Sequence, residues 1–133
     1  MAETKLLDEC DVVVPVNRIA EYLAFVNRAG EECGLVIRSF GHAGDGNLHI
    51  YILRDELDEK TWKNKLAAAF ADLYAKAGEF GGKVSGEHGI GYAKREFLRQ
   101  SCPAEEIQIM RGIKAVFDPQ NILNPGKVAA AGN

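Results

Sequence analysis

The stretch "LVIRSFGHAGDGNLHIYIL", residues 35–53, places two strand-like runs on either side of a glycine-rich turn. The runs Leu35–Phe40 and Asn47–Leu53 are rich in β-branched and aromatic residues, which favour strands. The pair Asp45-Gly46 between them is a typical hairpin signal, because glycine tolerates the backbone angles of a tight turn. The sequence therefore predicts an antiparallel β-hairpin here.

The flanking segments extend this hairpin into a larger pattern. Upstream, the β-branched run Asp11–Val16 predicts a strand, and a helix capped by Asn17 follows it and ends at Gly34. Downstream, a second helix begins near Asp58, "GEFGG" ends it, and "KVSG" predicts a short fourth strand. This order is typical of a split βαβ unit, with a four-stranded antiparallel sheet and both helices on one face.

The remaining residues predict helices. "YAKREFLRQ" is one candidate helix, and another begins at Pro103 and stops before Pro119. The predicted fold class is therefore α+β, a ferredoxin-like split βαβ antiparallel sheet with additional C-terminal helices.

Composition excludes several classes of protein. A chain of 133 residues fits one domain, and its net charge of −3 without a basic stripe argues against nucleic-acid binding. No apolar run approaches the ~20 residues that a transmembrane helix needs. The three cysteines have no CxxC spacing, and the N-terminus does not resemble a signal peptide. These features predict a cytoplasmic protein.

Polar residues alternate with apolar ones along the strand 47–53. Asn47, His49 and Tyr51 share one face of this strand, and the residues between them form an apolar face that should pack against the helices. A row of amide, imidazole and phenol groups on one face of a strand is more typical of a binding site than of a solvated surface. Asn47 and Tyr51 are therefore candidate substrate-binding residues.

The same face offers ligands for a divalent metal. His42 ends the neighbouring strand, and opposite residues on paired strands lie ~5 Å apart, so its imidazole and that of His49 could share a cation. Glu87, in "SGEHGIG", would add a carboxylate and leave open positions on zinc, iron or manganese. In a plain split βαβ sheet the fourth strand ends away from the hairpin turn. Glu87 therefore reaches the histidines only if the site lies across the sheet face.

Three long motifs together resemble one enzyme family. "GHAGDGNLH", "SGEHGIGYAKREFL" and "IKAVFDPQNILNPGKV" are similar to the C-terminal part of the FAD-linked 2-hydroxyacid oxidases and dehydrogenases, and the resemblance runs from about Asp11 to Val128. It implies that residues 1–133 are the C-terminal part of the substrate (cap) domain of a larger enzyme. The FAD-binding domain would be absent from this chain.

The resemblance also implies roles for single residues. In relatives with a metal, the ligands correspond to His42, His49 and Glu87, and His88 lies beside substrate and flavin as the candidate catalytic base. Some relatives have a lysine before the first strand that helps hold a dicarboxylate. Glu9 and Cys10 stand there in this chain, which favours a small monocarboxylate such as lactate or glycolate.

The expected function is the FAD-dependent oxidation of a small D-2-hydroxy acid to the 2-oxo acid, with the isolated chain inactive. The expected partners are an FAD-binding domain or subunit and a second copy in a homodimer. Localisation would be cytoplasmic, or at a membrane through partner subunits. Two alternatives remain open: a stand-alone metal-dependent hydrolase, and a non-catalytic module that dimerises through its sheet.

Overall fold

The computed structural model describes residues 7–130, which divide into two compact units at the boundary between Glu87 and His88. The first unit holds the sheet and two long helices, and the second holds two helices and the C-terminal tail. The prediction that the N-terminus does not resemble a signal peptide depends partly on residues 1–6, which lie outside the described residues. Within residues 7–130, no helix has the length and apolar character needed to cross a membrane.

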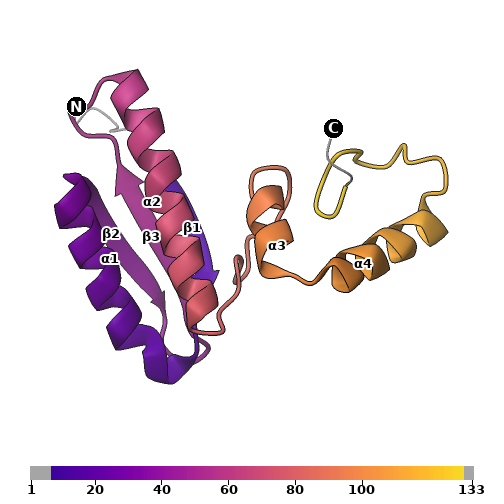
Figure 1. Ribbon diagram of the computed structural model, residues 1–133, viewed down its shortest axis with the longest axis horizontal. Helices are drawn as coiled ribbons and strands as arrows, with labels where there is room; N and C mark the ends of the chain where they lie inside the picture. The colour runs from indigo at the N-terminus through magenta and orange to yellow at the C-terminus, as the bar shows by residue number, and fades with distance from the viewer. Residues whose placement is uncertain (1–6, 131–133) are drawn as a thin grey trace. The chain divides into compact units, whose positions relative to one another are not determined.

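The sheet of the first unit has three antiparallel strands in the order β1-β3-β2. They are β1 (Leu7–Val13), β2 (Val36–His42) and β3 (Asn47–Leu53), of which β3 has the predicted bounds (Figure 1). The predicted fourth strand is reduced to one antiparallel bridge, between Val13 and Lys83. No ladder continues from that bridge, because the next residues bond instead to a side chain of β1, as described below.

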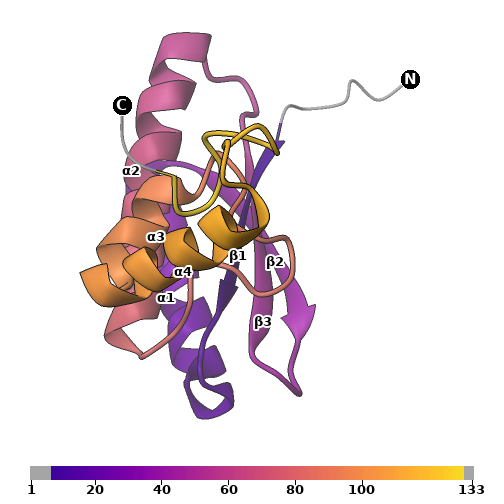
Figure 2. The ribbon, with the colours of Figure 1, turned by 90° about the vertical axis from the view of Figure 1, so that its right-hand side faces the viewer.

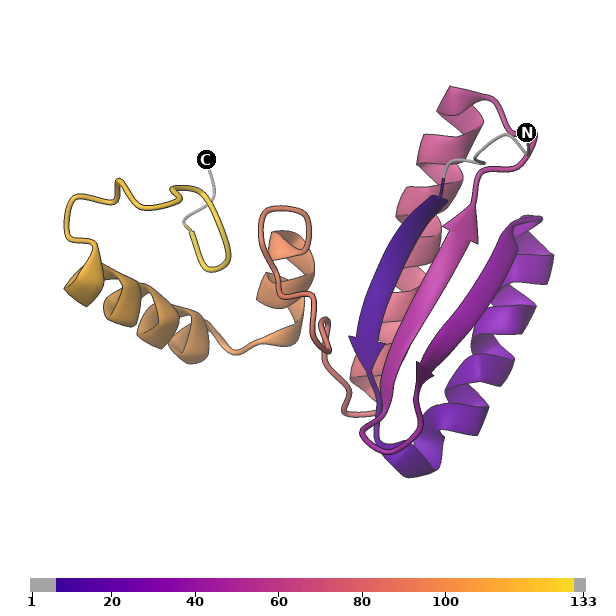
Figure 3. The same cartoon turned by 180° about the vertical axis from the view of Figure 1, so that it is seen from behind.

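Two helices cover one face of this sheet and leave the other face open (Figure 3). They are α1 (Ile19–Cys33) and α2 (Glu59–Glu79), and Figure 2 shows α2 and the β2–β3 hairpin from the side. The predicted start of α2 is confirmed, since the Asp58 carboxylate accepts from the backbone N–H groups of Lys60 and Thr61, both at 3.0 Å.

The first predicted strand is shifted. It was expected over residues 11–16, but β1 ends at Val13, and a 3-10 turn, η1 (Val16–Arg18), precedes α1. Pro15 explains the early end, because proline has no N–H for a strand ladder. Asn17 does not cap the helix as predicted; Arg18 stands at that position, without a side-chain cap hydrogen bond.

The core lies between the helices and the apolar face of the sheet. Ile50 and Ile52 of β3 are fully buried there, as the alternation predicted. The Tyr22 hydroxyl joins α1 to α2 by donating to the backbone oxygen of Leu73 at 3.0 Å. Burial of each such apolar side chain stabilises the folded state by about 1.5–3 kcal/mol. The apolar face is therefore committed to the core, and only the opposite face of the sheet is left for a site.

The second unit contains α3 (Arg95–Ser101), α4 (Ala104–Phe117) and the tail that follows them. Three arginines of these helices donate to backbone oxygens of the tail: Arg95 to Gly126 at 2.8 Å, Arg99 to Ala130 at 2.6 Å, and Arg111 to Ala129 at 2.6 Å. Arg95, Arg99 and Arg111 thus connect the two helices to the tail.

Candidate functional site

The hairpin turn positions His42 at the end of β2. The backbone oxygen of His42 accepts from the N–H groups of Asp45 at 3.3 Å and Gly46 at 3.1 Å. Asp45 forms the turn as expected, because its carboxylate accepts from the N–H of Asn47 at 2.9 Å. Gly46 has a φ of 79°, and a Cβ there would lie 1.9 Å from the backbone oxygen of Val14, so the turn requires glycine.

The two histidines of the turn meet on the open face of the sheet. In the strand register His42 is opposite Asn47, and His49 is opposite Phe40. His42 and His49 are therefore diagonal neighbours, not direct partners. Their ring centroids lie 6.0 Å apart and their planes are almost perpendicular, at 83°.

Asp11 of β1 draws the segment after Lys83 onto this open face. Its side chain is fully buried and accepts from Ser85 Oγ at 2.8 Å, from Gly86 N at 3.0 Å and from Glu87 N at 3.4 Å. Asp11 is the register partner of His49, so the segment passes over that histidine. The site therefore lies across the sheet face, which was the condition for Glu87 to reach the histidines.

The three predicted metal ligands come together. Glu87 Oε1 lies 3.2 Å from His49 Nε2, and one ligand atom each from His42, His49 and Glu87 lie within 4.8 Å of one another. The His49 side chain is only 12% exposed, whereas that of Glu87 is 52% exposed. Two imidazole nitrogens and one carboxylate oxygen at this separation, open to solvent on one side, fit a divalent cation with free positions.

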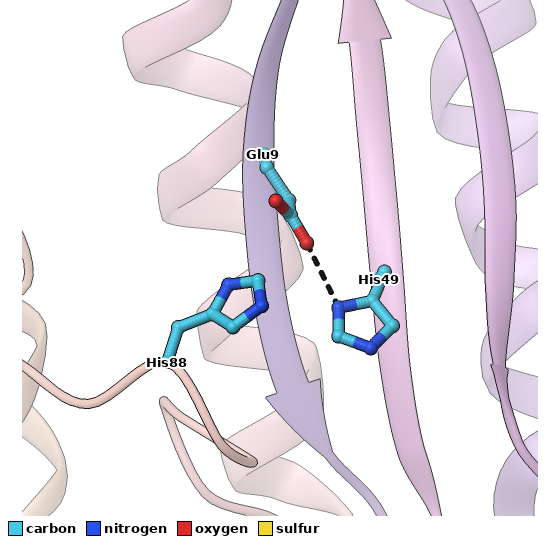
Figure 4. A group of neighbouring side chains, drawn as sticks. All are labelled: Glu9, His49 and His88. Atoms are coloured by element: carbon cyan, nitrogen blue, oxygen red, sulfur yellow. Dashed lines mark hydrogen bonds and ion pairs between the residues drawn. The ribbon is translucent and has the colours of Figure 1, made fainter.

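The other nitrogen of His49 faces Glu9, which is not among the predicted site residues. Glu9 Oε1 lies 2.8 Å from His49 Nδ1, and Figure 4 shows the carboxylate on β1 pointing toward the imidazole on β3. Tyr51 joins this pair: burial, the negative charge of Glu9 and a hydrogen bond to Glu9 raise the pKa of the Tyr51 hydroxyl. Alternation in β1 could have revealed Glu9 and Asp11, because they share one face of the strand.

The predicted substrate-binding residues differ in exposure. Asn47 is 4% exposed and lies against Gly86, where an added Cβ would be 2.1 Å from Asn47 Oδ1. Tyr51 is half-buried and borders a shallow depression of about 440 Å³, whose other lining residues are Arg38, Phe40, His49 and Leu53. His88, the predicted base, is the first residue of the second unit and is exposed.

Comparison with known proteins identifies the family of this chain. The family described as "FAD linked oxidases, C-terminal domain" matches residues 1–128. This chain belongs to that family. The prediction from the three motifs is thereby confirmed, together with the α+β fold class.

Several curated relatives are similar over almost the whole chain. D-lactate dehydrogenase from Anaerostipes hadrus is 52% identical over 127 residues, which are 96% of this chain and 27% of that protein. Glycolate oxidase subunit GlcD from Bacillus subtilis is 42% identical over 90% of this chain and 25% of its own length. D-2-hydroxyglutarate dehydrogenase from Stutzerimonas stutzeri is 39% identical, over 91% and 27%. The chain thus spans about a quarter of the length of these relatives.

Proposed function

We propose that this chain forms the substrate- and metal-binding portion of a flavin-dependent oxidoreductase that oxidises a small D-2-hydroxy acid to the 2-oxo acid. The observation that carries the proposal is the convergence of His42, His49 and Glu87 on the open face of the sheet. Membership of the FAD-linked oxidase family supports the flavin chemistry. The names of two relatives, D-lactate dehydrogenase and glycolate oxidase subunit, support the substrate class.

Two cofactors belong to this proposal. His42, His49 and Glu87 would hold a divalent metal, zinc or manganese or iron, which when bound lowers the pKa of a coordinated hydroxyl group. FAD, held mainly by an FAD-binding domain or subunit, supplies the acceptor for the hydride that leaves the substrate carbon. The contribution of this chain is to bind and orient the hydroxy acid and to receive its proton.

The proton of the substrate hydroxyl passes to His88 in this proposal. Imidazole is suited to this because it exchanges a proton near neutral pH. Asn47 and Tyr51 complete the substrate side of the site: Tyr51 borders the depression beside His49, and Asn47 lies against Gly86.

Glu9 favours a substrate with one carboxylate. Its side chain is only 22% exposed and lies on the same face as His49 and Tyr51. A second carboxylate brought beside it would be repelled, because like charges interact strongly where solvent is partly excluded. Lactate or glycolate avoids this repulsion, whereas a 2-hydroxy dicarboxylate would require a cation at this position.

A segment exchange tests the proposed reaction. This chain would replace the matching 127-residue segment of the Anaerostipes hadrus enzyme, and D-lactate-dependent reduction of a dye would be followed. We expect a yellow, active hybrid whose turnover falls at least ~10²-fold in the His88→Ala variant. Asp72→Asn on the outer surface of α2 is the control and should leave turnover unchanged.

Elemental analysis tests the metal site separately. The His49→Ala and Glu87→Gln variants of this chain, purified without chelator, should hold far less zinc or manganese than the parent. Equal metal content in the parent and both variants would contradict the ligand assignment. A flavin-loaded hybrid that oxidises neither D-lactate nor glycolate would contradict the proposed reaction.

A further inference from the structure

We infer that Glu9 is a positioning residue, whose carboxylate fixes the proton of His49 on Nδ1 and keeps Nε2 free for the cation. The inference rests on the proposed metal site and adds a residue to it. It starts from the two sides of one imidazole: Nδ1 lies 2.8 Å from Glu9 Oε1, and Nε2 lies 3.2 Å from Glu87 Oε1. The ring is thus held between two carboxylates from different segments.

The two contacts are chemically different. An ionised carboxylate only accepts hydrogen bonds, so the short contact with Glu9 requires a proton on Nδ1. The neutral imidazole that binds a cation then has its lone pair on Nε2, which faces Glu87 and His42, where the three ligand atoms lie within 4.8 Å of one another. A cation bound there would lie between Nε2 and Glu87 Oε1, so this second carboxylate would not require a proton on Nε2. Histidines that bind metals commonly donate their other N–H in this way, which fixes the ring and raises its basicity.

Glu9 is itself held in place. It is the register partner of Tyr51 in the pairing of β1 with β3, and the Tyr51 hydroxyl bonds to its carboxylate. Two residues further along β1, Asp11 bonds to the backbone of the segment that carries Glu87. Alternate residues on one face of β1 thus position two of the three ligands: Glu9 orients the His49 ring, and Asp11 holds the backbone of Glu87.

A competing interpretation makes Glu9 a direct metal ligand. The two interpretations differ in what a glutamine at this position would do. Glutamine keeps an oxygen that can accept from Nδ1 but is a poor substitute for a ligating carboxylate. Methionine has a similar length and provides neither function.

Zinc titration of the 133-residue chain by calorimetry separates these interpretations. For Glu9→Met we expect a zinc dissociation constant about 10–100-fold above that of the parent, in the range found when outer partners of metal ligands are lost. Glu9→Gln should stay within about threefold of the parent, because it retains the acceptor. Asp72→Asn, an exposed change that also removes one negative charge, should bind like the parent and controls for general attraction of the cation.

Nitrogen-15 spectra of the histidine rings provide a readout that does not depend on affinity. In the zinc-loaded parent and in Glu9→Gln, His49 should show a protonated Nδ1 and a ligated Nε2. In Glu9→Met the Nδ1 proton should exchange faster with water, or part of the population should ligate through Nδ1. Glu9→Ala serves the same purpose if Glu9→Met does not fold.

Three results would overturn the inference, and they are distinguishable. Zinc bound by His49 with unchanged affinity and an unchanged ring in Glu9→Met would remove the positioning role alone. An equally large loss in Glu9→Gln and Glu9→Met would make Glu9 a ligand. A parent chain whose zinc binding is insensitive to His49→Ala would end both this inference and the proposed metal site.

Discussion

Asp11 Oδ1 accepts a hydrogen bond from the backbone N–H of Gly86 at 3.0 Å, and this contact joins residues 75 positions apart in the chain. The same carboxylate also binds Ser85 and the N–H of Glu87. The Asp11 carboxylate is fully buried because residues 85–87 cover it. It accepts hydrogen bonds from the backbone of this segment, which carries the candidate ligand Glu87. Asp11 of the first strand thus determines where the distant Glu87 lies.

Asp11→Asn should weaken both folding and metal binding. The amide nitrogen of asparagine would face a backbone N–H at one of the two positions where a carboxylate oxygen now accepts, so one buried donor loses its partner. We expect a loss of about 1–3 kcal/mol in the free energy of unfolding. Zinc affinity should fall as well, because Glu87 would no longer be held beside His49. Chemical denaturation and zinc titration measure the two effects.

Ser85→Ala is the graded comparison for that experiment. It removes one of the three hydrogen bonds to Asp11 and leaves both backbone contacts, so its cost should be about 1 kcal/mol. If Ser85→Ala destabilises the chain as much as Asp11→Asn, the backbone contacts at Gly86 and Glu87 do not have the importance assigned to them.

Gly86→Ala should disturb the site through a steric clash. The new Cβ would lie 2.1 Å from Asn47 Oδ1, and the buried Asn47 cannot move aside easily. Overpacking of this kind costs about 1–3 kcal/mol, and lifting the segment away from the sheet should lower zinc affinity about tenfold. Gly44→Ala is the matched control, because a Cβ there meets nothing within 4 Å. Equal zinc affinities in the two variants would contradict this account of the segment.

The sequence predicted the parts of the fold that follow from periodicity and turn chemistry. Strand β3 has its predicted bounds because apolar residues alternate along it, and α2 begins where Asp58 can cap it. The prediction of a fourth strand was wrong because the Asp11 side chain accepts backbone hydrogen bonds after Lys83, which a strand would instead make to its neighbour in the sheet. Long-range competition of this kind leaves no local signal in a single sequence.

The candidate site divides in the same way. His42, His49 and Glu87 could be selected because their side chains are metal ligands within glycine-rich motifs. Glu9 and Asp11 alternate along β1, but this signal was missed because the predicted strand began at Asp11 and its register with β3 was unknown. Once the pairing of Glu9 with Tyr51 and of Asp11 with His49 is given, both acids fall on the open face.

Acid should remove the contribution of Asp118 to the stability of the second unit. A hydrogen bond from the Lys114 ammonium group, with further ones from the N–H groups of Ile122 and Leu123, holds the pKa of this carboxyl below its ordinary value of 3.8. A lowered pKa in the folded state stabilises the fold above pH 3.8, and this contribution is lost as pH falls through the lowered value. Asp118→Asn should therefore unfold at a lower temperature than the parent at pH 5–7, and the difference should shrink below about pH 3.8.

Nuclear magnetic resonance of the Ile122 and Leu123 amides during heating follows this segment directly. Both amides donate to Asp118, at 2.9 Å and 3.0 Å, so they report on the carboxylate that is changed. A difference between parent and variant that is constant from pH 7 to pH 2.5 would show that the carboxylate charge does not contribute.

The 133-residue chain should self-associate through α4. Val116 and Phe117 are 77% and 79% exposed, and Ile109 and Ile113 on the same helix are also exposed. Apolar groups gathered in this way rarely stay uncovered on folded chains, and a net charge of −3 provides little repulsion between copies. A closed twofold dimer is the commonest arrangement that covers such a surface. Light scattering on a size-exclusion column at micromolar concentration should therefore give a dimer mass.

The double substitution Val116→Ser and Phe117→Ser should shift that mass to the monomer, while Gln108→Ser, an exposed polar change on the same helix, should not. A parent chain that elutes as a monomer, or a dimer that survives the double substitution, would show that α4 is not the contact.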